Sequence, residues 1–303
     1  MKTLSLRRLR PGEWGEEAQL IAQSTNAWYQ ASGKPAIFTG DPGQCEVFCQ
    51  VYEALDPGCC VVAQDTQTGA LVGSCFFHPR STHFSLGIVN THPEYFGHGI
   101  ARKMLDEVIG LAERAGKPLR LVSSAMNLDS FSLYTRAGFV PRMLFHDMLL
   151  PDSKRLPKPD PRVRPVTAAD VAALVVLELE LVGIERTKDF AYFTENALGI
   201  WSGSVWEEGG EIGGFLFAVA HPASNLLGPG VARTQEIAAA LLATERQKHP
   251  GNPVFLVPAT CTALLQTLYS WGARNCELHV AQVRGAWQEP LGVLFPTFLP
   301  ETG

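Results

Sequence analysis

The chain has 303 residues, of which 46% are hydrophobic and 18% are charged, and this composition indicates a globular protein of about two domains. Its formal net charge of −5 argues against nucleic acid as the main partner, because phosphate contacts need clustered lysine and arginine. No apolar run approaches the length of a membrane span, and the first residues do not resemble a secretion signal, so no membrane partner is expected. Seven cysteines without a C-x-x-C pair favour free thiols, and we expect a cytoplasmic protein.

The first 150 residues are predicted to alternate between strands and helices. We expect a strand at 4–10, helices at 16–31 and 42–54, a hairpin of strands at 59–65 and 70–77, a strand at 84–91, a helix at 100–115, a strand at 119–124, a helix ending before Gly138, and final strands over 139–150. Asp41 and Pro42 are typical of the N-cap and first position of a helix, and Asp129 is the expected N-cap of the last helix. The class is α/β (α+β) with a mostly antiparallel sheet.

The second half of the chain is predicted to repeat the first. Residues 151–162 have the proline-rich, charged composition of a linker. The matching positions are Arg10, Pro11 and Glu16 with Arg164, Pro165 and Asp170, and Leu121 and Gly138 with Phe255 and Gly272 at an equal spacing of 17 residues. A strand at 212–220, an apolar helix ending at 242 and a strand at 254–257 complete the predicted repeat.

Two glycines, Gly97 and Gly99, lie where the fourth predicted strand leads into the third predicted helix. Such a turn leaves the amides of the first helical turn open, and these amides together with the helix dipole bind anions. Arg102 and Lys103 add positive charge in a turn where acidic residues are usual. A plain tight turn would use the same glycines. A dinucleotide-binding fingerprint is a second alternative, although residues 116–118 (GKP) stand where its ribose-binding acid is expected.

A second motif lies downstream and consists of Asn127, Ser130, Tyr134, Gly138 and Phe139. Together the two segments resemble the acetyl-CoA site of the GNAT superfamily of N-acetyltransferases. The first is similar to the pyrophosphate loop of the family, Q/R-x-x-G-x-G/A, and the second to its N-x-x-S/A-x-x-x-Y-x-x-x-G-F signature. The chain departs from the loop pattern at Phe96, where the family usually has Gln or Arg, but backbone amides provide most of the binding there.

The resemblance implies a site for acetyl-CoA. The cofactor-binding residues it implies are Asn90, Thr91, Phe96, Gly97, His98, Gly99, Ile100, Ala101, Arg102, Asn127, Ser130 and Tyr134. By the same resemblance, the backbone N–H of Val89 stabilises the oxyanion. Tyr134 is implied as the general acid, since a phenol with a pKa of about 10 is protonated at neutral pH.

The general base is not evident from the motifs. Some members of the family carry a glutamate at the position of Ser85, and serine is a poor proton acceptor. His78 and His83 are therefore the expected candidates, with Glu46 or a chain of water molecules as alternatives. The histidines of this region lie at strand ends and turns without an i,i+4 pair, so no metal site is expected.

Trp28 and Tyr29 lie where helices of the family border the substrate cleft. They are expected as acceptor-side contacts together with Ser85, and the alternative is that they are core aromatics.

The predicted organisation is two tandem GNAT-like domains, each a twisted, mostly antiparallel central sheet flanked by helices. The predicted units are a catalytic domain over residues 1–150, a linker over 151–162 and a degenerate copy over 163–303. The second copy is called degenerate because Leu268 and Cys261 stand where the first has Tyr134 and Asn127. We expect acyl transfer from acetyl-CoA to a primary amine of a small molecule or amino acid. The alternatives are a second CoA site and a non-catalytic acyl-CoA-binding regulatory or scaffold protein; acyl length and a homodimer stay open.

Overall fold

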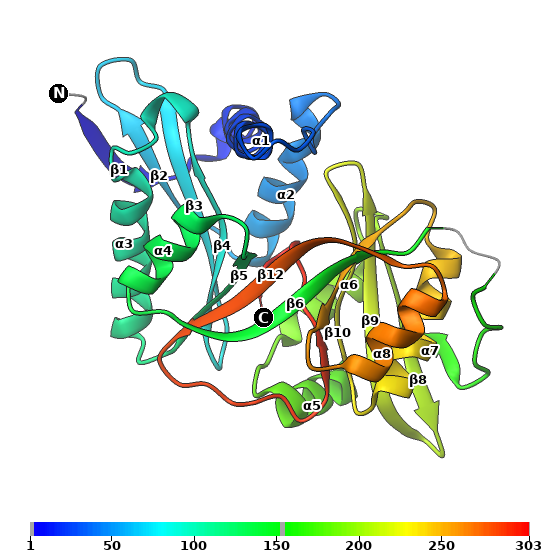
Figure 1. The fold of residues 1–303 in the computed structure, drawn as a ribbon. Helices are drawn as coiled ribbons and strands as arrows, with labels where there is room; N and C mark the ends of the chain where they lie inside the picture. The colour runs from blue at the N-terminus through cyan, green and yellow to red at the C-terminus, as the bar shows by residue number, and fades with distance from the viewer. Residues whose placement is uncertain (1–2, 152–154, 303) are drawn as a thin grey trace.

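The computed structural model describes residues 3–151 and 155–302, and it contains one large sheet with helices on both faces (Figure 1). The thirteen strands are β1 (Leu4–Arg8), β2 (Cys60–Asp65), β3 (Leu71–Pro79), β4 (Phe84–Thr91), β5 (Leu119–Ser124), β6 (Val140–Leu149), β7 (Val163–Pro165), β8 (Trp201–Glu208), β9 (Glu211–His221), β10 (Ser224–Ala232), β11 (Val254–Pro258), β12 (Arg274–Arg284) and β13 (Val293–Phe295). The α-helices are α1 (Trp14–Ala31), α2 (Glu46–Leu55), α3 (Ile100–Arg114), α4 (Leu128–Arg136), α5 (Val171–Val182), α6 (Thr187–Glu195), α7 (Gln235–Lys248) and α8 (Thr262–Ser270). Short 3-10 helices are η1 (Pro11–Glu13), η2 (Pro42–Cys45), η3 (Pro93–Tyr95) and η4 (Ala168–Asp170).

The predicted mixed class and the order of elements are confirmed, with two local corrections. Asn127, not Asp129, is the N-cap of α4, because its side chain accepts the N–H of Ser130 at 3.1 Å. The expected final strands over 139–150 are a single strand, β6. Part of the predicted linker, residues 152–154, lies outside the described residues.

The internal repeat is confirmed, but its beginning is displaced by three residues from the predicted match. Arg164 forms an ion pair with Asp170, which precedes α5. The equivalent pair in the first half joins Arg7 to Glu13, which precedes α1 in the same way. Both arginines lie on or next to the first strand of their half, so the repeat starts at Arg7 instead of Arg10.

Each half inserts one long strand into the sheet of the other. The order across the sheet is β1-β2-β3-β4-β5-β12-β6-β11-β10-β9-β8-β7, with β13 paired to β10. The second half therefore inserts β12 between β5 and β6 of the first, and the first half inserts β6 between β12 and β11 of the second. Figure 1 shows these two long strands running side by side where the halves meet.

Strands β4 and β5 are parallel and diverge along their length. They pair only at Phe84 with Leu119 and at Ser85 with Arg120. Beyond these pairs the two strands have no shared ladder, so the sheet opens toward the end of β4 at Thr91. The resemblance to the GNAT family implies that Asn90 and Thr91 pair here with the pantetheine arm of acetyl-CoA, in the space between the two strands.

Three apolar clusters show how the halves are joined. One cluster lies on a single face of the sheet and contains side chains of α1 and α2 from the first half and of α5 and α6 from the second. A second cluster stays within the first half, where α3 and Tyr134 pack on β2–β5. In the third, α7 and α8 pack on β9–β11 together with Met148 and Leu150 from the end of the first half. The halves therefore share one core in addition to the exchanged strands.

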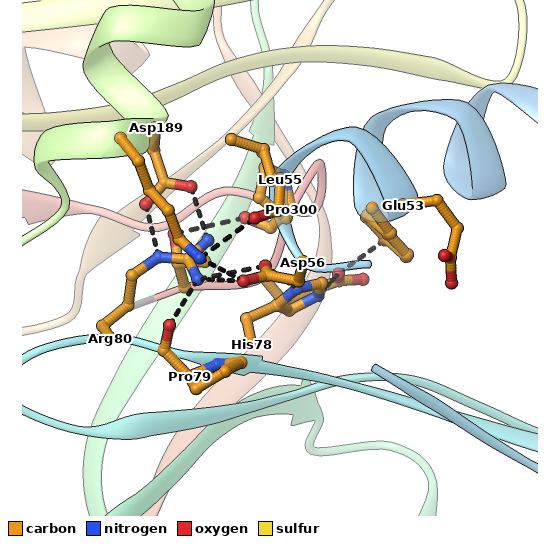
Figure 2. A network of polar contacts seen from close by, with 12 residues as sticks. Glu53, Leu55, Asp56, His78, Pro79, Arg80, Asp189 and Pro300 are labelled. Atoms are coloured by element: carbon orange, nitrogen blue, oxygen red, sulfur yellow. Dashed lines mark hydrogen bonds and ion pairs between the residues drawn. The ribbon is translucent and has the colours of Figure 1, made fainter. Parts of the chain in front are cut away.

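A buried network of charged side chains crosses between the halves (Figure 2). Arg80, which follows β3, pairs with Asp56 at 2.9 Å and with Asp189 of α6 at 2.5 Å. His78 contacts the same Asp56 through Nδ1 at 2.9 Å, and Lys188 also forms an ion pair with it. Burial by itself would raise the pKa of Asp56, but His78, Arg80 and Lys188 outweigh it and lower this pKa to about 2.

The C-terminal segment lies against this network. The Tyr52 hydroxyl of α2 donates to the Glu301 carboxylate at 2.6 Å. The carbonyl oxygen of Thr302 lies 2.6 Å from Nε2 of His83, and Arg186 donates to the Thr302 hydroxyl at 3.2 Å. Residues from both halves thus hold this segment in place.

No α-helix within residues 3–151 and 155–302 is both long and apolar enough to cross a membrane. The seven cysteines are free thiols.

Residues 1–150 produced alone should aggregate. This fragment lacks β12 and β11, so β5 would present an unpaired edge and β6 would lose both of its neighbours in the sheet. Size-exclusion chromatography and near-UV circular dichroism would measure the effect. Co-expression with residues 159–303 is the control and should restore a soluble complex; a monomeric fragment with native dichroism would contradict the prediction.

The substitution Asp56→Asn should destabilise the protein by about 3–5 kcal/mol, because it removes one partner from a buried charged network. The folded-state pKa of Asp56 lies below its ordinary value of 3.8. Its stabilising contribution is therefore complete above pH 4 or so and is lost as the pH falls toward about 2. Urea unfolding between pH 5 and pH 2.5 should show a steeper loss of stability for the wild type than for the variant. Equal slopes would contradict the assignment.

Candidate functional site

The glycine loop at the start of α3 leaves backbone amides open. Gly97 and Gly99 have φ angles of 77° and 73°, a conformation that side chains other than glycine rarely adopt. A Cβ atom at either position would meet nothing within 4 Å, so the loop is open above both glycines. The N–H of Lys103 donates to Gly99, and the three preceding amides, those of residues 100–102, have no partner within the helix. This arrangement can hold phosphate oxygens.

The side chains around the loop contribute less than the sequence predicts. Phe96 is half exposed, and His98 contacts the carbonyl oxygen of Phe96 through Nδ1 at 3.0 Å. Arg102 donates to Asp106 one helical turn along, at 2.8 Å, so its guanidinium is engaged in an exposed ion pair. The anion site therefore consists mainly of backbone amides.

The outer half of β4 presents backbone groups to the opening beside it. The N–H of His92 donates to the carbonyl of Val72 in β3 at 2.9 Å. Because N–H groups alternate in direction along a strand, that of Asn90 also faces β3, whereas those of Val89 and Thr91 face the β5 side. The Asn90 side chain accepts from the hydroxyl of Ser24 on α1. The N–H groups of Val89 and Thr91, expected to contact the thioester and the pantetheine arm, thus face the opening, whereas the N–H of Asn90, also expected to contact that arm, faces away from it.

Helix α4 places Tyr134 on the face of the sheet that α3 covers, opposite to the face covered by α1. Asn127 caps this helix by accepting the N–H of Ser130, so the three-residue spacing of Asn127 and Ser130 in the motif also allows a capping hydrogen bond. Tyr134 is buried against Phe139, and within the described residues its hydroxyl has no hydrogen-bond partner. Burial, with a smaller effect of Cys75, raises the pKa of Tyr134, so the hydroxyl is protonated and can donate.

The structure does not support the histidines as proton acceptors. His83 precedes β4, and both of its ring nitrogens are in contact with Thr82 and Thr302. His78 is fully buried in the network with Asp56 and pairs across the strands with Ser85, four residues before Val89. Burial lowers the pKa of both histidines. Ser85 is also buried, and its hydroxyl has no partner in the described part of the chain.

Trp28 and Tyr29 lie at the end of α1 and are half-buried, and Tyr29 reaches across the opening to the second half. Its hydroxyl donates to Glu277 of β12 at 3.0 Å, and Lys34 forms an ion pair with the same carboxylate at 3.2 Å. Sequence reasoning missed Glu277, because its position beside β5 depends on the strand exchange. No local pattern around Glu277 signals that placement.

The equivalent region of the second half is closed. Residues 228–230 (GPG) lie within β10, so no glycine loop precedes α7. The side chain of Thr234 caps α7 by accepting the N–H of Ile237 at 3.3 Å. Leu268 occupies the place of Tyr134. The same backbone hydrogen bond ends both helices: the N–H of Phe139 donates to the carbonyl of Tyr134, and the N–H of Ala273 donates to that of Leu268. Cys261 is the N-cap residue of α8, as Asn127 is of α4.

Comparison with known families agrees with this geometry. A model described as "Acetyltransferase (GNAT) family" matches residues 25–139, and one described as "Acetyltransferase (GNAT) domain" matches residues 174–290. The chain therefore belongs to the GNAT superfamily of acetyltransferases and carries two GNAT domains in tandem. None of the curated proteins matches the sequence.

Solved structures share the fold over nearly the whole chain. A putative acetyltransferase from Pyrococcus horikoshii has a TM-score of 0.79 at 15% identity, covering 99% of this chain and 96% of that one. A GCN5-related N-acetyltransferase from Sphaerobacter thermophilus has a TM-score of 0.65 at 16% identity, covering 94% and 96%. A tandem GNAT protein from the clavulanic acid biosynthesis pathway has a TM-score of 0.62 at 16% identity, covering 94% and 100%. At such identities the likeness concerns the fold.

The substitution Gly99→Asp should abolish CoA binding, because a carboxylate would lie among the amides that hold the phosphates. Titration calorimetry with CoA measures the effect. Gly116→Asp is the matched control, since Gly116 has a φ of 65° and equally open surroundings at the far end of α3. It carries the same backbone strain and should bind CoA like the wild type; equal loss in both variants would contradict the assignment.

Proposed function

We propose that this protein is an acetyl-CoA-dependent N-acyltransferase that transfers an acyl group directly to a primary amine of a small molecule or amino acid. The observation that carries the proposal is the glycine loop of α3, with three open amides, at the end of a strand that diverges from its neighbour. In the proposal, residues 1–150 form the catalytic domain and residues 163–303 a copy that no longer binds the cofactor.

The residues of the first half fit the requirements of acyl transfer. Acetyl-CoA supplies the acyl group as a thioester. When the acceptor starts as an ammonium ion, the reaction exchanges the carbon–sulfur bond for a carbon–nitrogen amide bond and releases the free thiol and one proton. The open amides of α3 bind the pyrophosphate, and the N–H of Val89 is oriented to stabilise negative charge on the carbonyl oxygen. The Tyr134 hydroxyl holds the proton that the departing thiolate needs.

The asymmetry between the halves supports catalysis in the first. At the start of α7, the Thr234 side chain accepts a hydrogen bond from the first helical turn, whereas Gly99, at the equivalent position of α3, has no side chain to do so. Leu268 replaces the hydroxyl of Tyr134 with an aliphatic group. A helix end that is already capped has fewer free donors for phosphate.

A non-catalytic acyl-CoA-binding function is the competing proposal. It is favoured by the absence, within the described residues of the first half's β4, of a carboxylate beside the expected reaction centre: Ser85 stands there. Incubation with acetyl-CoA and a panel of primary amines, with detection of free thiol, separates the two. Amine-dependent thiol release supports the enzyme, and CoA binding without release supports the scaffold.

The substitution Tyr134→Phe should lower turnover on the order of 10²-fold and leave CoA affinity within a few-fold, because it removes the acid but keeps the packing ring. Steady-state thiol release and calorimetry measure the two quantities. Tyr269→Phe, the same chemical change on the equivalent helix of the second half, is the control and should be neutral, since Tyr269 is 46% exposed. Unchanged turnover in Tyr134→Phe would mean that the tyrosine only packs.

A further inference from the structure

The carboxylate of Glu277 lies at the junction of three elements of the first half, although the residue belongs to the second. Ser124, at the end of β5, donates to its Oε1. Tyr29, at the end of α1, donates to its Oε2 at 3.0 Å, and Lys34, on the following loop, lies 3.2 Å away. The Glu277 side chain is only 6% exposed. Insertion of β12 into the first sheet is what brings it here.

Strand register places this carboxylate at the height of Val89. Strands β4 and β5 are in parallel register at Ser85 and Arg120. Farther along, β4 contains a register shift between Leu86 and Val89, so Val89 lies about level with Ser123 and Ser124 of β5, on the other side of the opening. Because Ser124 holds the Glu277 carboxylate, that carboxylate lies beside the position at which the acyl carbonyl is proposed to bind.

The structure already holds an ammonium group against Glu277. The Lys34 ammonium lies 5.9 Å from the ring centroid of Trp28 and 5.5 Å from that of Tyr29. A carboxylate with two aromatic rings is an arrangement that proteins use to bind ammonium ligands. Lys34 lies on a loop and its side chain is 30% exposed, so an external ammonium group can replace it.

The charge balance favours a cationic occupant. In the part of the chain that the structure describes, Lys34 is the one cation within ion-pair distance of Glu277. The nearby His279 contacts a different carboxylate, that of Asp147, at 2.8 Å. Leaving a buried carboxylate without a counterion is costly, so departure of Lys34 favours entry of another cation.

We propose that Glu277 binds the ammonium group of the acceptor and takes its proton, and that Lys34 occupies this position when no acceptor is bound. The inference rests on the proposed function and extends it to a substrate class: a primary ammonium on an unbranched alkyl stem, like that of Lys34 itself. One proton passes from the ammonium nitrogen to a carboxylate oxygen of Glu277, leaving the nitrogen lone pair free. Burial and the neighbouring Glu277 raise the pKa of Tyr29, so its hydroxyl stays protonated and keeps the carboxylate oriented.

The first test is binding without turnover. Nα-acetyl-L-lysinamide, which carries the lysine ammonium on its own stem, is titrated into the full-length protein by calorimetry in the presence of CoA. Glu277→Gln keeps the size and hydrogen bonds of the side chain but removes its charge, and should weaken binding about 10-fold or more. Lys34→Met keeps contact with the aromatic rings and should tighten binding several-fold, because the internal competitor is gone.

The control is Glu180→Gln, which removes the charge of an exposed glutamate paired with Arg233 in the same half and should bind the probe like the wild type. Probe binding unchanged in Glu277→Gln, binding weakened or unchanged in Lys34→Met, or no binding by the wild type would each overturn the proposal.

The second test separates this proposal from the proposed function. Thiol release from acetyl-CoA is followed with the same probe and with the panel of primary amines. If the wild type releases no thiol with any amine, the proposed function fails, whereas the binding result for Glu277 stands on its own. If the wild type is active, Glu277→Gln should lower kcat as well as raise KM, and Glu277→Asp should recover part of kcat because it retains a proton acceptor. Wild-type kcat in Glu277→Gln would overturn the role in proton transfer.

Discussion

Insertion of β12 between β5 and β6 is the constraint on which the rest of the structure depends. An antiparallel strand with neighbours on both sides satisfies its backbone groups only when both neighbours are present, so neither half can complete its sheet alone. The shared apolar core of α1, α2, α5 and α6 and the buried Asp56–Arg80–Asp189 network then join the halves a second and third time. The two repeated halves are in this way joined into one continuous structure.

The exchange also explains why a copy without an open glycine loop can still matter to the first half. The proposed acceptor site draws its carboxylate from β12, and α1 supplies the aromatic rings above it. In these proposals the second copy lacks a phosphate site, because Thr234 caps α7 and no glycine turn precedes it, while strand β12 contributes to the acceptor site of the first half.

The surroundings of His78 and His83 differ from those expected of a catalytic base, although histidine is a suitable residue type for that role. His78 and His83 have the right chemistry for a base, but the network around Asp56 and the C-terminal segment occupies them. Both positions are buried by segments far away in sequence, α6 and residues 301–302. Burial lowers the pKa of both histidines and keeps their rings from solvent, and their observed contacts lie at the junction of the two halves.

Local chemistry is what the sequence by itself determined. Gly97 and Gly99 adopt the left-handed conformation that only glycine tolerates well, Asp41 caps its helix, and the repeat spacing of Gly138 and Gly272 reflects the same helix end in both halves. These features depend on a few neighbouring residues, so their patterns are readable. The predicted N-cap of α4, Asp129, lies two residues after the observed one, Asn127. Both residue types cap helices well, and only the observed bond to Ser130 distinguishes them. The partners of β6 and β12, and with them the position of Glu277, were decided by tertiary structure alone. Each strand has the same alternating pattern whichever sheet it joins, and the choice depends on which edge of the other half is free to receive it.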